Sequence, residues 1–390
     1  MRPFSELVVV EIAGSVAGAY AGKLFSDFGA KVLKVEPPGG DPARWTGALT
    51  QSGVSAAFEY LNTGKSSVAI HANTATGRGL LRELSLKADV IIESFSPGPA
   101  APLADEITAH ATAIRVRISP FGLEGTYRDH RSTPFTDFAV GGHMYLTGEP
   151  DREPLQGAPD QPLYAAGTHA YVGALAALIA REQTGRGQDI DVSHFEVMAS
   201  LHQWTTVRYT HGGIIQTRVG NRYGSLHPST IYECKDGYVA FGAVGNEPLR
   251  RFLSLVGMEE LLEDERFRTG SARFANADAF DAIIEPWMRQ RSVMEVVELG
   301  QSIRAAVAPV NDLSDLLSDP HLNAREFWQR PADSSDETYY PGPPFRMSGH
   351  DWRLRLSPAI SGSATNWLGE LTGSSESLQE AGSARHDPHD

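Results

Sequence analysis

The chain has 390 residues and a formal net charge of -14, with 41% hydrophobic and 21% charged residues. This length favours two or three domains, and the composition is typical of a folded globular protein. The acidic excess argues against a nucleic-acid partner, which draws on clustered Lys and Arg. No apolar run reaches about 20 residues and no signal-like segment opens the chain, so we expect no membrane span and a cytoplasmic location.

The first half of the chain alternates β-branched runs with helical patterns. Strands are predicted at residues 6–12, 30–36, 67–71, 88–93 and 113–118, and helices at 13–29 and 77–87. Strands that alternate with helices predict a parallel sheet with helices on both faces. We therefore expect a doubly wound, Rossmann-like α/β domain.

Three glycines, Gly14, Gly18 and Gly22, follow the first predicted strand at a spacing of four. This spacing differs from the Gly-x-Gly-x-x-Gly fingerprint of dinucleotide sites, so no NAD site is expected. Two interpretations remain open. The glycines permit close packing of a helix on a strand, or the loop at 15–18 lets a ligand approach the backbone.

The second half predicts a long Ala-rich helix at 164–181, a strand at 189–193, and a smaller α+β domain with a charged helix at 258–267. We place a large domain at 1–200, completed by about 315–365, and a small domain at 220–306. The tail at 373–390 is rich in Ser, Gly, Glu and His and is expected to be disordered. The single cysteine, Cys234, excludes an intrachain disulfide and is expected to be a buried thiol.

Several stretches, in order along the chain, resemble the family III CoA-transferases, which include formyl-CoA transferases, carnitine CoA-transferases and α-methylacyl-CoA racemases. The stretches are residues 7–44, with Phe-Gly-Ala-Lys-Val-Leu-Lys-Val-Glu-Pro-Pro at 28–38, then 88–98, 118–122, 181–193, 236–237, 307–309 and 323–327. Together they span nearly the whole chain, and their order is more specific than any one motif.

This resemblance implies an interlocked dimer and coenzyme A or acyl-CoA as a substrate. It implies a small carboxylic acid as the second substrate. Carried over position by position, the CoA contacts fall at Val16, Ala17, Gly18, Ile70, Asn73, Ser94, Phe95 and Ser96. Ser94 replaces an asparagine that is usual in the motif. The thirteen histidines show no ligand spacing, so no metal site is expected.

In the transferases an aspartate attacks the donor thioester, and this covalent step requires an oxygen nucleophile. Counted back from Thr-Gly-Arg-Gly-Gln at 184–188, the aspartate position falls at Leu163, or at Tyr164 with a one-residue gap. Two further positions of the family's site also fall on apolar residues. The glutamine that contacts the acyl group in many transferases falls at Val16, and an acidic residue falls at Pro134. The nearest carboxylate in sequence is Asp160, in the irregular stretch before the long helix, where a solvated turn residue is the alternative interpretation.

The racemases of the same family use paired acids and bases instead. The position of their glutamate falls at Glu247, and that of their histidine falls near Thr133. The racemase interpretation therefore lacks one of the two groups that exchange the proton. His169, early in the long helix, is a further catalytic candidate or a packing residue. Asp137 is a site residue or a solvated capping residue.

Three functions therefore remain open. The first is an acyl-CoA:carboxylate CoA-transferase. The second is a catalytically silent CoA-binding subunit that supports a paralogue in a heteromer. The third is a repurposed acyl-CoA racemase or isomerase that uses Glu247 or His169.

Overall fold

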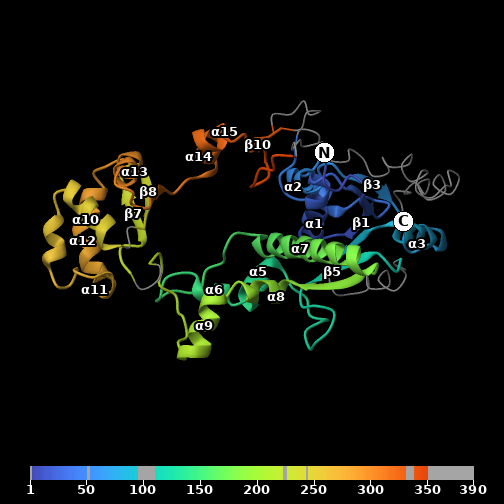
Figure 1. The fold of residues 1–390 in the computed structure, drawn as a ribbon, viewed down its shortest axis with the longest axis horizontal. Helices are drawn as coiled ribbons and strands as arrows, with labels where there is room; N and C mark the ends of the chain where they lie inside the picture. The colour runs from blue at the N-terminus through green and yellow to red at the C-terminus, as the bar shows by residue number, and fades with distance from the viewer. Residues whose placement is uncertain are drawn as a thin grey trace, which may run out of the picture. The chain divides into compact units, whose positions relative to one another are not determined.

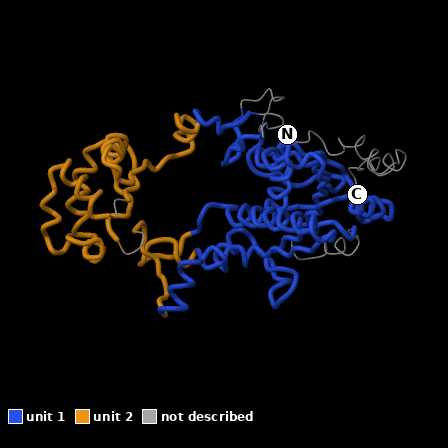
Figure 2. The backbone as a smooth tube through the Cα atoms, viewed as in Figure 1, with its two compact units in different colours: residues 1–143, 156–212, 323–390 blue, residues 144–155, 213–322 orange. Residues whose placement is uncertain are grey.

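The computed structural model describes residues 2–50, 53–94, 110–222, 226–242, 245–330 and 338–349 (Figure 1). The chain divides into two compact units (Figure 2). Unit 1 contains residues 1–143, 156–212 and 323–390, and unit 2 contains residues 144–155 and 213–322. The domain boundaries expected from the sequence stay a prediction, and the tail at 373–390 lies outside the described residues.

Unit 1 is built around a parallel sheet of six strands in the order β3-β2-β1-β4-β5-β6. The central strands β1 and β4 are rich in Val and Ile and buried, as a parallel sheet covered on both faces requires. The expected α/β fold with a parallel sheet is confirmed. The strands are β1 (Val8–Ala13), β2 (Lys31–Glu36), β3 (Ser66–Ala69), β4 (Val90–Ser94), β5 (Ile114–Ser119) and β6 (Gln188–Ser193).

Helices cover both faces of this sheet. Successive residues of β1 point to opposite faces: Val9 packs in the core with α1 and α7, whereas Val10 packs with Leu81 and Leu84 of α3. The helices of unit 1 are α1 (Val16–Asp27), α2 (Ala56–Leu61), α3 (Ala75–Lys87), α5 (Pro134–Val140), α7 (Gln161–Thr184), α8 (His194–Ser200) and α9 (Gln203–Gly212), with the 3-10 helix η1 (Pro42–Trp45). A short antiparallel pair, β10 (Trp328–Gln329) and β11 (Tyr340–Pro341), belongs to the returning C-terminal segment.

The long helix α7 packs along α1 on one face of the sheet (Figure 1). Small residues make this close approach possible: a methyl group added at Gly167 would lie 2.6 Å from the backbone oxygen of Ala17. By length and apolarity alone, α7 could also cross a membrane, a property that it shares with core helices of globular proteins. The side of α7 that carries Ala166, Ala170 and Ala174 is buried in the core of unit 1.

A buried ion network joins β1 and β2 to the chain after α2. The Glu11 carboxylate is paired with Lys34 at 3.1 Å and with Lys65 at 2.6 Å, and all three side chains are at most 1% exposed. Lys34 is also paired with Asp41 at 2.9 Å. Gly22 of α1 leaves the space that Glu11 fills, since an added methyl group would overlap the carboxylate. Two positively charged lysines in the core are thus balanced by carboxylates.

Unit 2 contains a three-stranded antiparallel sheet in the order β7-β8-β9, covered by helices. Its core is aromatic and includes Phe241, Phe252, Phe267 and Phe280. The strands are β7 (Thr230–Cys234), β8 (Gly237–Phe241) and β9 (Val307–Pro309); the main helices are α10 (Asn246–Leu255), α11 (Gly270–Ala275), α12 (Ala277–Met288) and α13 (Val293–Ser302), followed by α14 (Leu313–Ser318) and α15 (Pro320–Ala324). The short helix α6 (His143–Leu146) spans the boundary of the units.

Two expectations about unit 2 are tested by its local structure. The charged helix expected at 258–267 is only a short 3-10 helix, η2 (Glu259–Glu263). It ends because Asp264 accepts hydrogen bonds from the backbone and guanidinium of Arg266, a local turn that competes with a helix. The expected burial of Cys234 is confirmed, and burial raises the pKa of its thiol, so it is not a reactive thiolate.

Candidate functional site

The predicted CoA-binding residues lie mainly at the carboxyl ends of β1 and β4. The strand order reverses between these two neighbours, and ligands of open α/β sheets bind in the crevice at such a point. Ser15 is the N-cap of α1 and accepts a hydrogen bond from Gly18 N. Its hydroxyl also forms a hydrogen bond with the Ser94 hydroxyl at the end of β4. The two serines thus join the start of α1 to the end of β4.

The individual contact residues differ in their accessibility. Val16 is half-buried, whereas Ala17 and Gly18 are buried beneath the start of α1. A methyl group added at Gly18 would lie 2.5 Å from Ala13 Cβ and 2.7 Å from Ser94 Cβ, so this glycine serves close packing of α1 on the sheet. The packing interpretation therefore holds at Gly18.

Of the other predicted contacts, Ile70 is buried after β3 and Asn73 is exposed before α3. Phe95 and Ser96 lie outside the described residues. Among the described contact residues, Val16 and Asn73 are therefore the accessible ones.

The predicted catalytic position lies in the first turn of α7. Leu163 is half-buried and packs against the core of unit 1. Tyr164 contacts Tyr20 of α1 edge to face, with ring centroids 4.9 Å apart. The first turns of α1 and α7 therefore meet, and the structure brings the predicted positions on these two helices into one region.

Asp160 is the carboxylate at the start of α7. It adopts a left-handed conformation with φ of 58°, which is uncommon for a residue other than glycine. Its backbone oxygen accepts hydrogen bonds from Leu163 N and Tyr164 N, but its side chain makes no capping hydrogen bond. The side chain is half-buried, and its charge helps to raise the pKa of Tyr164 after the larger effect of burial. Asp160 thus holds an available carboxylate beside the predicted position.

Pro134 and Asp137 lie in α5, close to the start of α7. Asp137 is 1% exposed and accepts hydrogen bonds from Ser132 and, at 3.0 Å, from His194 Nδ1 of α8. The interpretation of Asp137 as a solvated residue is therefore wrong, because its carboxylate is enclosed between α5 and α8. The other ring nitrogen of His194 is buried with no hydrogen-bond partner. No sequence pattern marks His194 as the partner of Asp137, because the two residues are far apart in the chain.

The two remaining catalytic candidates have ordinary surface environments. His169 is exposed on α7, and its Nδ1 donates to the Ala165 oxygen at 2.8 Å. Glu247 lies in the first turn of α10 in unit 2, where its exposed side chain pairs with Arg251 at 3.0 Å. Their catalytic roles stay predictions.

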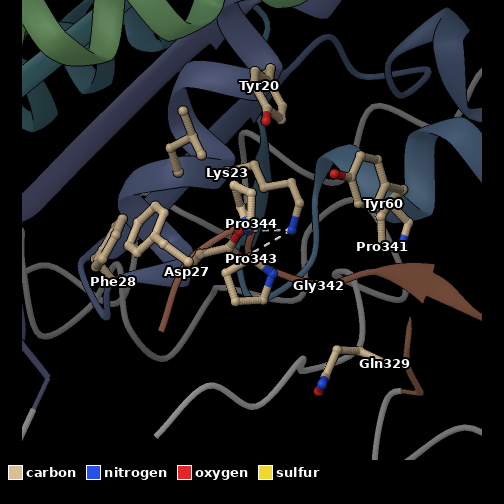
Figure 3. Close-up of a pocket in the computed structure, with 12 residues that line it drawn as sticks. Tyr20, Lys23, Asp27, Phe28, Tyr60, Gln329, Pro341, Gly342, Pro343 and Pro344 are labelled. Atoms are coloured by element: carbon tan, nitrogen blue, oxygen red, sulfur yellow. Dashed lines mark hydrogen bonds and ion pairs between the residues drawn. The ribbon is translucent and has the colours of Figure 1, made fainter. Parts of the chain in front are cut away.

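A pocket lies beside Tyr20, between α1, α2 and the returning segment 341–345 (Figure 3). Lys23 is buried in its wall, paired with Asp27 at 2.9 Å and hydrogen-bonded to Thr63 Oγ1 at 2.8 Å. The lysine Nζ lies 4.7 Å from the ring centroid of Tyr60. Burial raises the pKa of Asp27, and it also raises the pKa of both Tyr20 and Tyr60. No motif marks this pocket in the sequence, because its walls come from three distant segments.

Comparison with known proteins identifies the class of this fold and site. The family model described as CoA-transferase family III matches residues 4–363. The chain belongs to CoA-transferase family III.

Individual relatives agree with this assignment. The chain is similar to the succinyl-CoA:(R)-benzylsuccinate CoA-transferase subunit BbsE of Thauera aromatica, with 32% identity over 92% of each chain. It is 32% identical to the succinyl-CoA--D-citramalate CoA-transferase of Chloroflexus aurantiacus, over 83% of this chain and 82% of that one. Among solved structures, a CAIB/BAIF family protein from Brucella suis superposes with a TM-score of 0.86 and 31% identity, covering 95% of this chain and 99% of the other.

Proposed function

We propose that the chain acts in transfer of coenzyme A between an acyl-CoA thioester and a small carboxylic acid. Family membership and relatives named as CoA-transferases support this reaction class. The observation that carries the proposal is Asp160, a half-buried carboxylate at the start of α7 whose side chain makes no capping hydrogen bond. The start of a 24-residue helix favours a negative charge there, so the carboxylate is available as a nucleophile.

In the proposed reaction an oxygen of Asp160 attacks the thioester carbonyl carbon. The carbon–sulfur bond breaks, which leaves a mixed anhydride and a CoA thiolate. The thiolate then attacks the aspartyl carbonyl, so that the donor acid leaves and an aspartyl-CoA thioester remains. The acceptor carboxylate repeats these two steps in reverse order, which forms the new acyl-CoA and regenerates Asp160. The adenosine end of CoA would lie at the crevice formed by Ser15, Val16 and Ser94.

A specific observation favours a second function, that of a silent CoA-binding subunit in a heteromer with a paralogue. The three positions where the family resemblance places catalytic groups hold the apolar residues Val16, Pro134 and Leu163. An aliphatic side chain supplies neither a nucleophile nor a proton. A relative of nearly full coverage, BbsE of Thauera aromatica, is named as a subunit, which is consistent with such an assembly.

Trapping of the covalent intermediate separates the two functions. The purified chain is incubated with succinyl-CoA and other acyl-CoA donors, then treated with hydroxylamine or borohydride and examined by mass spectrometry. An active transferase gives a modified Asp160, and Asp160→Asn abolishes the adduct. The matched control Asp151→Asn changes an exposed aspartate in the preceding segment and should leave the adduct unchanged.

The outcomes lead to different conclusions. An adduct that survives in Asp160→Asn assigns the nucleophile elsewhere and contradicts the role of Asp160. A chain that forms no adduct alone, yet binds CoA and restores transfer when mixed with a paralogue, supports the silent subunit.

We further propose that the protein works in the cytoplasm as an interlocked homodimer or as a heteromer. The family resemblance and the relatives named as subunits support an oligomer. Fractionation of cells with detection of the native chain tests the location, and recovery in the membrane fraction would contradict it.

A further inference from the structure

Two half-buried histidine side chains of unit 1 lie against each other. His143 is the first residue of α6, and His202 stands between α8 and α9. Their ring centroids are 4.0 Å apart and the ring planes are inclined by 33°. Gly142 leaves room for this approach, since an added methyl group would lie 3.1 Å from His202 Nε2. Because the two rings are in contact, a charge on one acts directly on the other.

Each ring of this histidine pair also donates a hydrogen bond to the segment that carries the other ring. His143 Nε2 donates to the Met198 oxygen at 2.9 Å, and His202 Nε2 donates to the Gly141 oxygen at 2.7 Å. A carbonyl oxygen only accepts, so Nε2 carries the hydrogen in both neutral rings. The other ring nitrogen, Nδ1, is therefore the atom that takes up a proton when either ring becomes charged.

His202 is also the residue from which α9 begins. Its backbone oxygen accepts a hydrogen bond from Thr206 N at 2.9 Å, which makes His202 the N-cap of this helix. The start of a helix carries a partial positive charge from the backbone dipoles, so an imidazolium is unfavourable there. A charge on His202 is thus opposed by α9 as well as by a charge on His143.

Other ionisable groups lie on the elements around the pair. Those on α5, α6, α8 and α9 are Asp137, Tyr145, His194, Glu196, Arg208 and His211. Asp137, the buried carboxylate among them, already accepts hydrogen bonds from Ser132 and His194. Glu196 and His211 are exposed, where solvent screens their charges. Burial, and after it the charge of His143, lowers the pKa of His202, although its hydrogen bond to Gly141 opposes the shift.

The pair lies next to two places at which the chain leaves unit 1. His143 is the last residue before the chain enters unit 2, and α9 ends at Gly212, after which the chain enters unit 2 again. No residue of α9 is buried. The attachment of α9 to unit 1 therefore depends strongly on the contacts at its start, which are those of His202.

We propose that His143 and His202 form an acid-sensitive attachment of α9 to unit 1. In the neutral pair, the two crossed hydrogen bonds and the contact between the rings hold the start of the helix. When both rings are protonated, two positive charges with centres 4.0 Å apart repel each other, and one of them opposes the dipole of α9. The rings then separate and α9 loosens, together with its exposed Trp204 and Tyr209.

Hydrogen–deuterium exchange of the full-length chain tests this attachment. A histidine whose pKa is lower in the attached state binds more protons after release, so release becomes easier as the pH falls through about 6.5. After correction for the intrinsic exchange rate, protection of the α9 amides should fall about threefold or more between about pH 7.5 and 5.5. The amides of α3, a helix of unit 1 that contains no histidine, should change little.

Two variants remove the two charges separately. His202→Asn keeps a residue that is favoured at an N-cap, and His143→Phe keeps a flat ring in the contact. Each should reduce the pH dependence of protection in α9. His321→Asn, the same change at an exposed histidine of α15, should leave it as in the native chain. In His143→Phe, the pKa of His202 measured by NMR should also rise, because the charge of His143 helps to lower it.

Three results would overturn the proposal. The first is a loss of α9 protection no larger than that of α3, and the second is full pH dependence in both His202→Asn and His143→Phe. The third is an unchanged pKa of His202 in His143→Phe, a measurement that decides the question even if His202→Asn does not fold. Circular dichroism shows whether each variant is folded.

Discussion

At the residue scale, the core of unit 1 depends on charges that the sequence pattern did not reveal. Lys34 lies among apolar residues of β2 and Lys65 directly precedes β3, but nothing in the sequence shows that both meet Glu11. The same holds for Asp137 and His194, which are 57 positions apart. Candidate residues on one motif, such as Ser94, can be predicted from sequence, whereas pairs between distant segments arise only when the chain folds.

The buried network predicts a specific dependence of stability on pH. Burial lowers the pKa of Lys65 to about 8, although Glu11 opposes this shift. In the unfolded chain the pKa is about 10.4, so between pH 8 and 10 the unfolded state binds more protons and the free energy of unfolding rises with pH. Lys34, whose pKa is raised, stays charged throughout this range. We expect a gain of about 2 kcal/mol from Lys65 between pH 7.5 and 9.5.

Urea unfolding at these two pH values measures the gain. Lys65→Met should lack this part of the slope, while Lys87→Met, at an exposed position of α3, should keep the native slope. Equal slopes in the native chain and Lys65→Met would contradict the lowered pKa.

At the element scale, the sequence predicted the strands of the large sheet and the long helix well. Runs of Val and Ile mark the central strands β1 and β4, because the middle of a parallel sheet is buried on both faces. In β2 and β5 charged residues interrupt the apolar ones. The prediction of a helix at 258–267 was wrong. The charged residues of this segment have a high helix propensity, but propensity does not show that a local turn at Asp264 ends the helix. The sequence placed the starts of α1 and α7 in one candidate site only through the family resemblance, because the two helices lie far apart in the chain.

The packing of α1 on the sheet predicts that the same substitution has different effects at two glycines. Gly18→Ala should destabilise unit 1 by about 1–3 kcal/mol, because the added methyl group would force α1 away from Ala13 and Ser94. It should also weaken CoA binding, since Ser15 and Ser94 would separate. The matched variant Gly14→Ala meets no atom within 4 Å and should be neutral in urea unfolding. A Gly18→Ala chain as stable as the native one would contradict this account of α1.

At the whole-molecule scale, α9 suggests how the chain assembles. Not one of its ten residues is buried, and a helix this short is only marginally stable in water without packing partners. It exposes 68% of Trp204 and 59% of Tyr209. The sequence predicts an oligomer only through family resemblance, because the exposure of α9 depends on where the rest of the chain lies.

In the proposed oligomer a neighbouring subunit that covers α9 would remove these apolar side chains from water. Trp204→Asp should therefore shift the native protein toward the monomer in light scattering coupled to size-exclusion chromatography, because a charge replaces an apolar anchor. Trp204→Phe, which keeps an aromatic ring, should leave the assembly largely intact. An oligomer that is unchanged in Trp204→Asp would show that α9 does not hold it together.

The space that Gly22 leaves for Glu11 has a consequence for the evolution of the chain. The two positions are coupled, because a side chain at one removes the room needed by the other. A larger residue at position 22 becomes tolerable only when position 11 has already become shorter, as in Glu11→Asp. Substitutions in this part of the core should therefore be inherited as pairs, and the order in which they arise should decide which descendants remain folded.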